Sequence, residues 1–174
     1  MKQEKKEDLT IFDGFGAYVI ARDYIQSGHE FSKAAQVKFF TLEADVAEEL
    51  ALLHLSQGFV LCDEAQKKAM ELPQERAERI ILKEMEQGFK LTEDILPEIA
   101  KLPQGLMILE NYFLGSEAAF SPEAQKLLIT LPELQKTAHK FVFNNKKAPR
   151  RLSDELLTYA KKQGWVRETT RQES

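Results

Sequence analysis

The sequence contains a single cysteine among its 174 residues, Cys62. One thiol cannot form a disulfide within the chain, which agrees with a reducing compartment but does not establish one. Asp63 and Glu64 follow Cys62 directly, and nearby negative charge raises the pKa of a thiol rather than lowering it. We therefore interpret Cys62 as a structural or incidental residue and not as a nucleophile.

Long apolar segments are also missing. No run approaches the roughly 20 apolar residues that a membrane-spanning helix needs, and the N-terminal residues MKQEKKEDLT lack the apolar core of a signal peptide. We expect a cytoplasmic protein with no integral membrane segment. The alternative is a translocated bacterial effector without a cleaved N-terminal signal, because residues 167–174 resemble the short polar C-terminal signals of effectors delivered by type IV secretion.

The common motifs for catalysis and cofactor binding are absent from the sequence. There is no phosphate-binding loop, no GxSxG nucleophile motif, no HExxH metal motif and no EF-hand loop. The three histidines do not pair at metal-ligand spacing, and we interpret His29 and His54 as surface or helix-capping residues. The sequence therefore predicts a protein that is not an enzyme, with no catalytic residue, cofactor or metal ion.

A pattern of about 30 residues recurs along the chain. We take Ala35, Ala65, Ile95 and Ala124 as anchors, which are spaced by 30, 30 and 29 residues. The positions four, seven and seventeen residues after each anchor are apolar in every copy: Phe39, Ala69, Ile99 and Leu128; Leu42, Leu72, Leu102 and Leu131; Leu52, Leu82, Tyr112 and Phe141. Offsets of 0, 4 and 7 lie on one face of a helix, so each copy is predicted to begin with a short amphipathic helix.

A turn and a second helix follow each first helix. Proline follows the leucine position in three copies, and Glu43 follows it in the remaining one. Proline disfavours a continuing helix but suits the first turn of a new one. The second helices are predicted at residues 43–56, 74–86, 104–114 and 133–143. Gly58 and Gly88 come after two of them and are expected to accept the left-handed conformation of a helix C-cap.

Side chains that can cap a helix N-terminus precede the first helix of every copy. They are Ser32, Asp63, Thr92 and Ser121. Aromatic residues at helix-period positions are interpreted as core rather than as a ligand cage: Phe39, Phe40, Tyr112, Phe113, Phe141 and Phe143. In the connectors, Phe59, Phe89 and Phe120 are expected to pack back over the helix pairs.

These observations predict an all-α fold with about ten helices and no β-sheet. The predicted architecture is a short αα-hairpin repeat array, similar to an α-solenoid, with ~30-residue units at 32–59, 60–89, 90–120 and 121–151. Partial units at both ends complete one helical-repeat domain over residues 11–166, between a disordered N-terminus at 1–10 and a flexible polar tail at 167–174. The alternatives are an irregular helical bundle and a closed rather than open stack.

Charge is distributed unevenly along the chain. Residues 1–135 hold 14 Lys and Arg against 24 Asp and Glu, whereas residues 136–174 hold 10 against 4. Four cations lie close together in the second segment: Lys146, Lys147, Arg150 and Arg151. They form a candidate basic patch for nucleic acid, lipid headgroups or an acidic protein, or else belong to a solvated loop. Trp165, after the last predicted helix, is a candidate interaction anchor if it is exposed.

The helix pairs resemble the αα repeats of tetratricopeptide and HEAT proteins, although a unit of 29–30 residues is shorter than either. The steps Leu72-Pro73, Leu102-Pro103 and Leu131-Pro132 are similar to the repeats of mitochondrial transcription termination factors, a resemblance limited to residues 57–135 that implies nucleic-acid binding. Such proteins would carry a basic inner surface, whereas residues 1–135 are acidic. The sequence therefore assigns the chain to no family.

The fold class favours a function in binding. We expect a non-enzymatic protein–protein interaction module, such as an adaptor, a scaffold or an effector-type helical-repeat protein, that binds a protein partner through one face of the stack. The alternative is binding of nucleic acid or an anionic surface through residues 136–174. An enzyme would need a pocket with convergent polar groups, which no motif indicates. The sequence leaves the partner's identity and the oligomeric state open.

Overall fold

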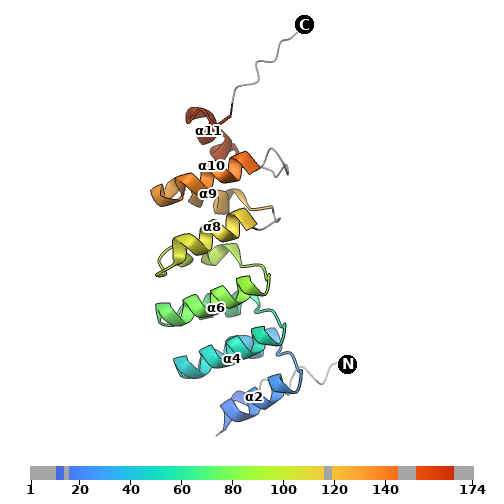
Figure 1. Ribbon diagram of the computed structural model, residues 1–174. Helices are drawn as coiled ribbons and strands as arrows, with labels where there is room; N and C mark the ends of the chain where they lie inside the picture. The colour runs from blue at the N-terminus through green and yellow to red at the C-terminus, as the bar shows by residue number, and fades with distance from the viewer. Residues whose placement is uncertain (1–10, 14–15, 116–118, 145–151, 167–174) are drawn as a thin grey trace. The chain divides into compact units, whose positions relative to one another are not determined.

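A computed structural model describes residues 11–13, 16–115, 119–144 and 152–166. Within these ranges the chain forms ten α-helices, three short 3-10 helices and no strand, so the all-α prediction is confirmed for this part (Figure 1). No helix in the same ranges is both long enough and apolar enough to cross a membrane. The expected disorder of residues 1–10 and the expected flexibility of residues 167–174 concern segments outside the described residues.

Helix bounds follow the predicted pairs closely. The α-helices are α2 (Ala17–Gln26), α3 (Lys33–Phe39), α4 (Ala44–Ser56), α5 (Asp63–Ala69), α6 (Gln74–Glu86), α7 (Leu96–Ile99), α8 (Gly105–Gly115), α9 (Pro122–Thr130), α10 (Gln135–Asn144) and α11 (Asp154–Lys162). The 3-10 helices are η1 (Ile11–Asp13), η2 (Glu93–Ile95) and η3 (Pro132–Leu134). Prolines account for two of the interruptions, because Pro97 occupies the first turn of α7 and Pro132 begins η3.

The chain divides into two compact units, Met1–Gly105 and Leu106–Ser174. In the first unit, α4 packs against both α2 and α6 (Figure 1). On the other side of each pair, α5 packs against both α3 and η2. In the second unit, α9 packs against α10 and α11. The single domain expected over residues 11–166 stays a prediction.

Two of the four expected N-caps are confirmed. The Ser32 hydroxyl accepts a hydrogen bond from the Ala35 amide at 3.3 Å, and the Ser121 hydroxyl accepts one from the Ala124 amide at 3.1 Å. The prediction for Asp63 was wrong, because Cys62 holds the N-cap position and Asp63 is the first residue of α5. There its charge lies near the positive end of the helix dipole. Thr92 lies at the N-cap position of η2, but its side chain makes no capping bond.

The repeated Gln-Gly-Phe phrase forms the end of a helix. At the C-terminus of α4, the Gly58 amide donates to the Leu55 carbonyl at 2.9 Å, and the Phe59 amide donates to the His54 carbonyl at 3.2 Å. This is the hydrogen-bond pattern of a Schellman motif, which needs a residue in the left-handed region. Gly58 supplies it with φ of 84°, and Gly88 supplies it after α6 with φ of 73°. Both C-cap predictions are confirmed.

Replacing Gly58 with alanine should lower the free energy of unfolding by about 1 kcal/mol, because a Cβ is unfavourable at positive φ. No atom would contact the added methyl group, so the effect isolates backbone conformation. Gly115 is the matched control, since it also has open space around it but no positive φ. Urea unfolding of both variants measures the difference, and equal stabilities would contradict the assignment.

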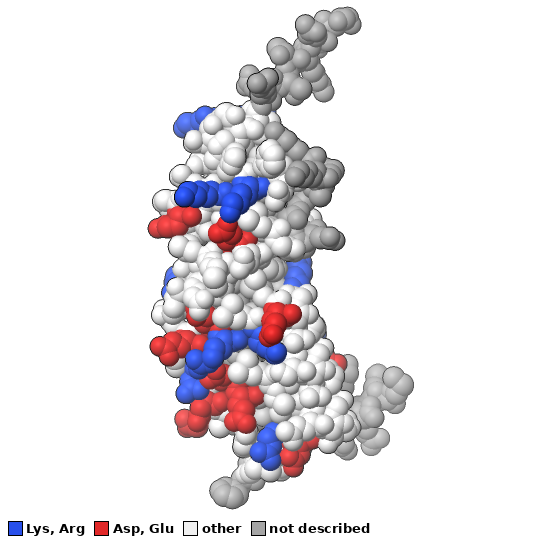
Figure 2. Space-filling view, in the orientation of Figure 1, with Lys and Arg blue, Asp and Glu red and all other residues white. Residues whose placement is uncertain are grey.

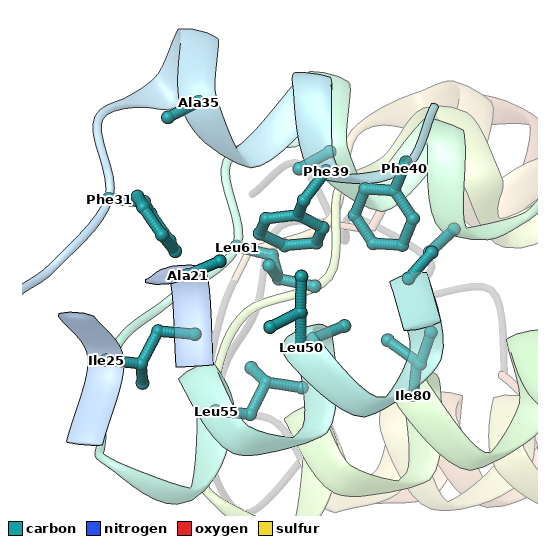
Figure 3. Close-up of a cluster of buried hydrophobic side chains, with 14 residues drawn as sticks. Ala21, Ile25, Phe31, Ala35, Phe39, Phe40, Leu50, Leu55, Leu61 and Ile80 are labelled. Atoms are coloured by element: carbon teal, nitrogen blue, oxygen red, sulfur yellow. The ribbon is translucent and has the colours of Figure 1, made fainter. Parts of the chain in front are cut away.

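The described core follows the first two apolar positions of the repeat. Every residue at the anchor and four residues later is buried: Ala35, Phe39, Ala65, Ala69, Ile95, Ile99, Ala124 and Leu128. In the first unit, Phe31, Phe39 and Leu50 lie within one cluster, in which the rings of Phe31 and Phe39 are 6.2 Å apart (Figure 3). This cluster joins α2, α3 and α4 to the connector that contains Leu61.

Other predicted core positions differ from the structure. Leu52 and Leu82 are only partly buried, whereas Tyr112 and Phe141 are buried, so the seventeen-residue offset does not mark one equivalent position. Phe143 is 50 % exposed and is not part of the core. The reason is that the buried positions of the later helices lie two residues closer to their anchors. His54 and Glu84 are buried 19 residues after their anchors, whereas Tyr112 and Phe141 are buried 17 residues after theirs.

Candidate functional site

Buried glutamines connect a helix to the residue before a later helix. Each is the residue that follows an anchor alanine, and each donates from Nε2 to the carbonyl five residues earlier. Its Oε1 accepts from the backbone amide of the residue before α5, η2 or α11. The glutamines are Gln36, Gln66 and Gln125, and the three amides they accept from are those of Cys62, Thr92 and Ser153, at 2.7, 2.6 and 2.8 Å. Both ends of each side-chain amide are thus used within the fold.

Gln66 also bonds to a carboxyl group and to a second backbone carbonyl. Its Nε2 lies 3.0 Å from Glu84 Oε1, 3.1 Å from the Lys90 carbonyl and 3.4 Å from the Leu61 carbonyl. Its Oε1 accepts from the Thr92 amide. One side chain therefore connects α5 to the end of α6 and to the connector before η2. Because Gln66 is only 1 % exposed, water cannot easily replace these bonds.

Buried carboxylates on α4 and α6 accept hydrogen bonds from residues later in the chain. Glu48 on α4 accepts hydrogen bonds from Arg76 and Arg79 on α6, and the Arg76 Nη1 to Glu48 Oε2 distance is 2.6 Å. The Arg79 hydrogen bond holds the pKa of Glu48 below its usual value. Thirty residues later, Glu78 accepts from both the amide and the side chain of Gln104, at 2.7 and 3.0 Å. These acids therefore contribute to packing between helices.

His54 is fully buried, and its interpretation as a surface or capping residue was wrong. Its ring lies 5.2 Å from Phe59, 6.3 Å from Phe31 and 6.4 Å from Phe39, measured between ring centroids. No hydrogen bond of normal geometry reaches either ring nitrogen from the described residues. Burial lowers the pKa of His54 to about 4 against a smaller opposing effect of the nearby Val60 backbone, so the ring is neutral at pH 7.

Glu84 is the second fully buried ionisable group of the first unit. Its Oε1 accepts from Gln66, and its Oε2 has no partner within the part of the chain that is described. Burial raises the pKa of Glu84 to about 8. Because this carboxyl group has one hydrogen bond and no cation near it among the described residues, it is held in its neutral, protonated form at pH 7.

An open cleft of about 1180 Å³ lies between the connectors that precede α3 and α5. Cys62 lines it, and its Sγ lies 3.8 Å from the Lys33 carbonyl. Burial is the leading cause that raises the pKa of this thiol, and the charge of Glu64 adds to it. The sequence argument gave the correct direction but named the smaller cause. A raised pKa leaves little thiolate at neutral pH, so Cys62 is not activated as a nucleophile.

The candidate basic patch of Lys146, Lys147, Arg150 and Arg151 lies outside the described residues. From the same basic segment, Lys140 forms an ion pair with Glu110, with Nζ and Oε1 2.6 Å apart. Among the described residues, no three side chains of His, Cys, Asp or Glu lie together as metal ligands would.

Trp165, the candidate interaction anchor, is partly buried in the second unit. Its ring makes edge-to-face contacts with His139 and Tyr159, at centroid distances of 5.1 and 5.5 Å. The side chain therefore packs over α10 and α11 and leaves only part of its surface exposed. Its role as an anchor for a partner stays a prediction.

A few large apolar side chains are exposed on the described surface. They are Val19 and Ile20 on α2, Val60 in a connector, Leu106 and Met107 on α8, and Phe143 on α10. The face in Figure 2 carries acidic and basic side chains close together, with broad areas of neither kind between them. Single exposed apolar residues are normal on any protein, but adjacent ones on the same helical turn are candidates for a contact surface.

No protein-family model, no curated protein and no solved structure matches the chain. The resemblances to repeat families therefore stay predictions, and the site must be interpreted from its own geometry. Sequence reasoning missed the glutamines, although Gln36, Gln66 and Gln125 occupy one position of the 30-residue pattern. The recurrence of glutamine after the anchor alanine was the signal, whereas the prediction compared only the apolar positions of the pattern.

Proposed function

We propose that the chain is an array of ~30-residue helix pairs that binds a protein partner through one face and carries out no chemistry. The observation that carries this proposal is the recurrent glutamine bridge. Gln36, Gln66 and Gln125 make the same two kinds of bond at corresponding places, which supports equivalent interfaces between successive first helices. Arrays built from such equivalent interfaces commonly present an extended binding surface.

The partial units at the ends are part of the same proposal. Helix α2 packs against α4 as α4 packs against α6, which supports α2 as a second helix without its first helix. Helix α11 packs against α9, and its Ser153 amide donates to Gln125 as the Thr92 amide donates to Gln66. This supports α11 as a first helix without its second helix.

The buried polar residues of the array form hydrogen bonds within the fold, so they are not available to a partner. The exposed apolar residues are the remaining candidates for a binding face. Leu106 and Met107 are adjacent on the first turn of α8 and are 39 % and 46 % exposed. Burial of their exposed apolar surface against a partner would be favourable by about 25 cal/mol per Å². We propose that they form part of the partner-binding face, where an apolar side chain of the partner contacts them.

Replacing Leu106 and Met107 together with serine should lower capture of the partner at least about 10-fold, because two apolar side chains would no longer be buried in the contact. The measurement is affinity capture of the intact protein, followed by a binding titration with the purified partner. Asn111→Ser is the matched control, since Asn111 is exposed on the same helix. Equal capture by both variants would contradict the proposed face, and capture of no protein would contradict the function.

The alternative function has a different outcome in the same experiment. Binding of nucleic acid or an anionic surface through residues 136–174 predicts capture that falls steeply as salt is raised, because phosphate contacts release counterions. It also predicts that Leu106 and Met107 can be replaced without effect, since neither is charged. Salt-sensitive capture of nucleic acid would therefore replace the protein-binding proposal.

A further inference from the structure

The connector between α6 and η2 is closed by a small set of hydrogen bonds around Glu84. The Phe89 amide donates to the Glu84 carbonyl at 2.9 Å, so the backbone of Glu84 fixes the start of the connector. Gln66 fixes its end through the Lys90 carbonyl and the Thr92 amide, at 3.1 and 2.6 Å. The carboxyl group of Glu84 lies against the same glutamine amide at 3.0 Å. Gln66 therefore links the packing of residues 87–92 against α5 and α6 to the protonation state of the Glu84 carboxyl group.

We propose that a proton on Glu84 keeps the connector 87–92 closed against α5 and α6, and that loss of this proton opens the connector. The neutral carboxyl group needs only modest hydrogen bonding when it is buried. Among the described residues, a carboxylate at the same place would have a single donor, Gln66, for one oxygen and no donor for the other. Opening of the connector would allow water to reach the charge, which is the least costly way to solvate it.

Among the described residues, no cation pairs with the Glu84 carboxyl group in the closed form. The lysines of the neighbouring turns pair elsewhere, in Lys67–Asp94, Lys68–Glu71 and Lys83–Glu86, with distances of 2.5, 2.8 and 2.9 Å. Lys90 contributes its backbone carbonyl, while its side chain is exposed. From α4, His54 occupies the corresponding buried position, and its pKa of about 4 leaves it neutral over the same pH range. Burial raises the pKa of Glu84 to about 8, and Gln66 alone opposes the rise.

The preceding connector provides a comparison within the same molecule. Residues 57–62 are closed by Gln36 and by the same pattern of backbone bonds after α4, but His54 stands where α6 has Glu84. That connector holds no buried carboxyl group. A response to pH near 8 should therefore occur at residues 87–92 and not at residues 57–62.

Hydrogen exchange of the full-length protein tests the proposal. Exchange of the amides of residues 88–92 should be about 10-fold faster in the wild type than in Glu84→Gln at about pH 9, and equal in the two at pH 6.5. Comparison at one pH cancels the intrinsic effect of hydroxide on exchange. Glu86→Gln is the matched control, because Glu86 is exposed on the same turn, and it should behave as the wild type does.

Two further readouts keep the proposal falsifiable if Glu84→Gln does not fold. In the wild type alone, residues 88–92 should lose protection relative to residues 58–62 as the pH rises through 8. The carboxyl carbon of Glu84, followed by carbon-13 NMR, should titrate near pH 8. Equal exchange of the two connectors at every pH, or titration of the Glu84 carboxyl below about pH 6, would overturn the proposal.

Discussion

Replacing Gln66 with leucine is expected to lower the free energy of unfolding by about 3–5 kcal/mol. Leucine has a similar volume but offers neither a donor nor an acceptor. The substitution therefore leaves the Thr92 amide, the Lys90 carbonyl and the Glu84 carboxyl group without the partner they have in the wild type. Each such group costs about 1–3 kcal/mol when it stays buried, and partial relaxation of the connector reduces the sum.

Two other glutamine-to-leucine substitutions serve as comparisons for the loss of stability in Gln66→Leu. Gln36→Leu removes the bonds to the Phe31 carbonyl and the Cys62 amide, and it should destabilise less than Gln66→Leu does, because no carboxyl group depends on Gln36. Gln74 is exposed at the start of α6, so Gln74→Leu should change stability by less than about 0.5 kcal/mol. Urea unfolding measures all three. Similar losses for Gln66 and Gln74 would show that the bridges carry no stability.

The contribution of His54 to the free energy of unfolding is expected to fall by about 3 kcal/mol as the pH drops from 6.5 to 4, and His54→Leu should remove this contribution. His54 has a folded pKa of about 4, against 6.5 in the unfolded chain. Between these values the unfolded chain binds a proton that the folded protein does not bind. Through this group acid favours unfolding across the window, and this contribution to the pH dependence disappears once the imidazole is gone.

Glu84 acts in the opposite direction over a window that extends to higher pH. Its folded pKa of about 8 exceeds the unfolded value of 4.5, so the unfolded chain releases a proton that the folded protein keeps. Stability from this group is present below pH 4.5 and is lost as the pH rises to 8. Between pH 4.5 and 6.5 the contributions of His54 and Glu84 to stability oppose each other. Between pH 6.5 and 8 only Glu84 contributes, and stability falls as the pH rises.

Urea unfolding at a series of pH values separates these contributions. The free energy of unfolding of the wild type should be nearly constant between pH 4.5 and 6.5. That of His54→Leu should fall steadily as the pH rises over the same range, because Glu84 then acts alone. His29→Gln is the matched control, since His29 is exposed after α2, and its profile should follow the wild type. Parallel profiles for His54→Leu and the wild type would contradict the assignment.

The apolar positions of the pattern were sufficient to predict the helices. Ala35 and Phe39, with their counterparts in later copies, mark the buried face of each first helix, and Pro73 and Gly88 delimit α6 to the residue. Local signals of this kind depend on backbone conformation and helical period, which the sequence states directly. They made the all-α fold predictable.

The polar interior could not be predicted in the same way. Gln66 and Glu48 are residue types that occur mostly at the surface, and their burial depends on partners 26–31 residues away. His54 was misplaced for the same reason, because a histidine near a helix end is consistent with both a cap and a core. Whether such a residue lies at the surface or in the core depends on how one helix pair packs on the next.

Deletion of residues 62–91 tests the central claim, that the chain is an array of equivalent helix pairs. The deletion removes one unit of 30 residues and joins Leu61 to Thr92, so the Thr92 amide replaces the Cys62 amide as the donor to Gln36. A control deletion of residues 62–76 removes half a unit and puts the helices out of register. Circular dichroism and urea unfolding measure the outcome. We predict unchanged helicity per residue and cooperative unfolding for the first deletion, with neither retained in the second. Loss of cooperative folding in the 30-residue deletion would contradict the account.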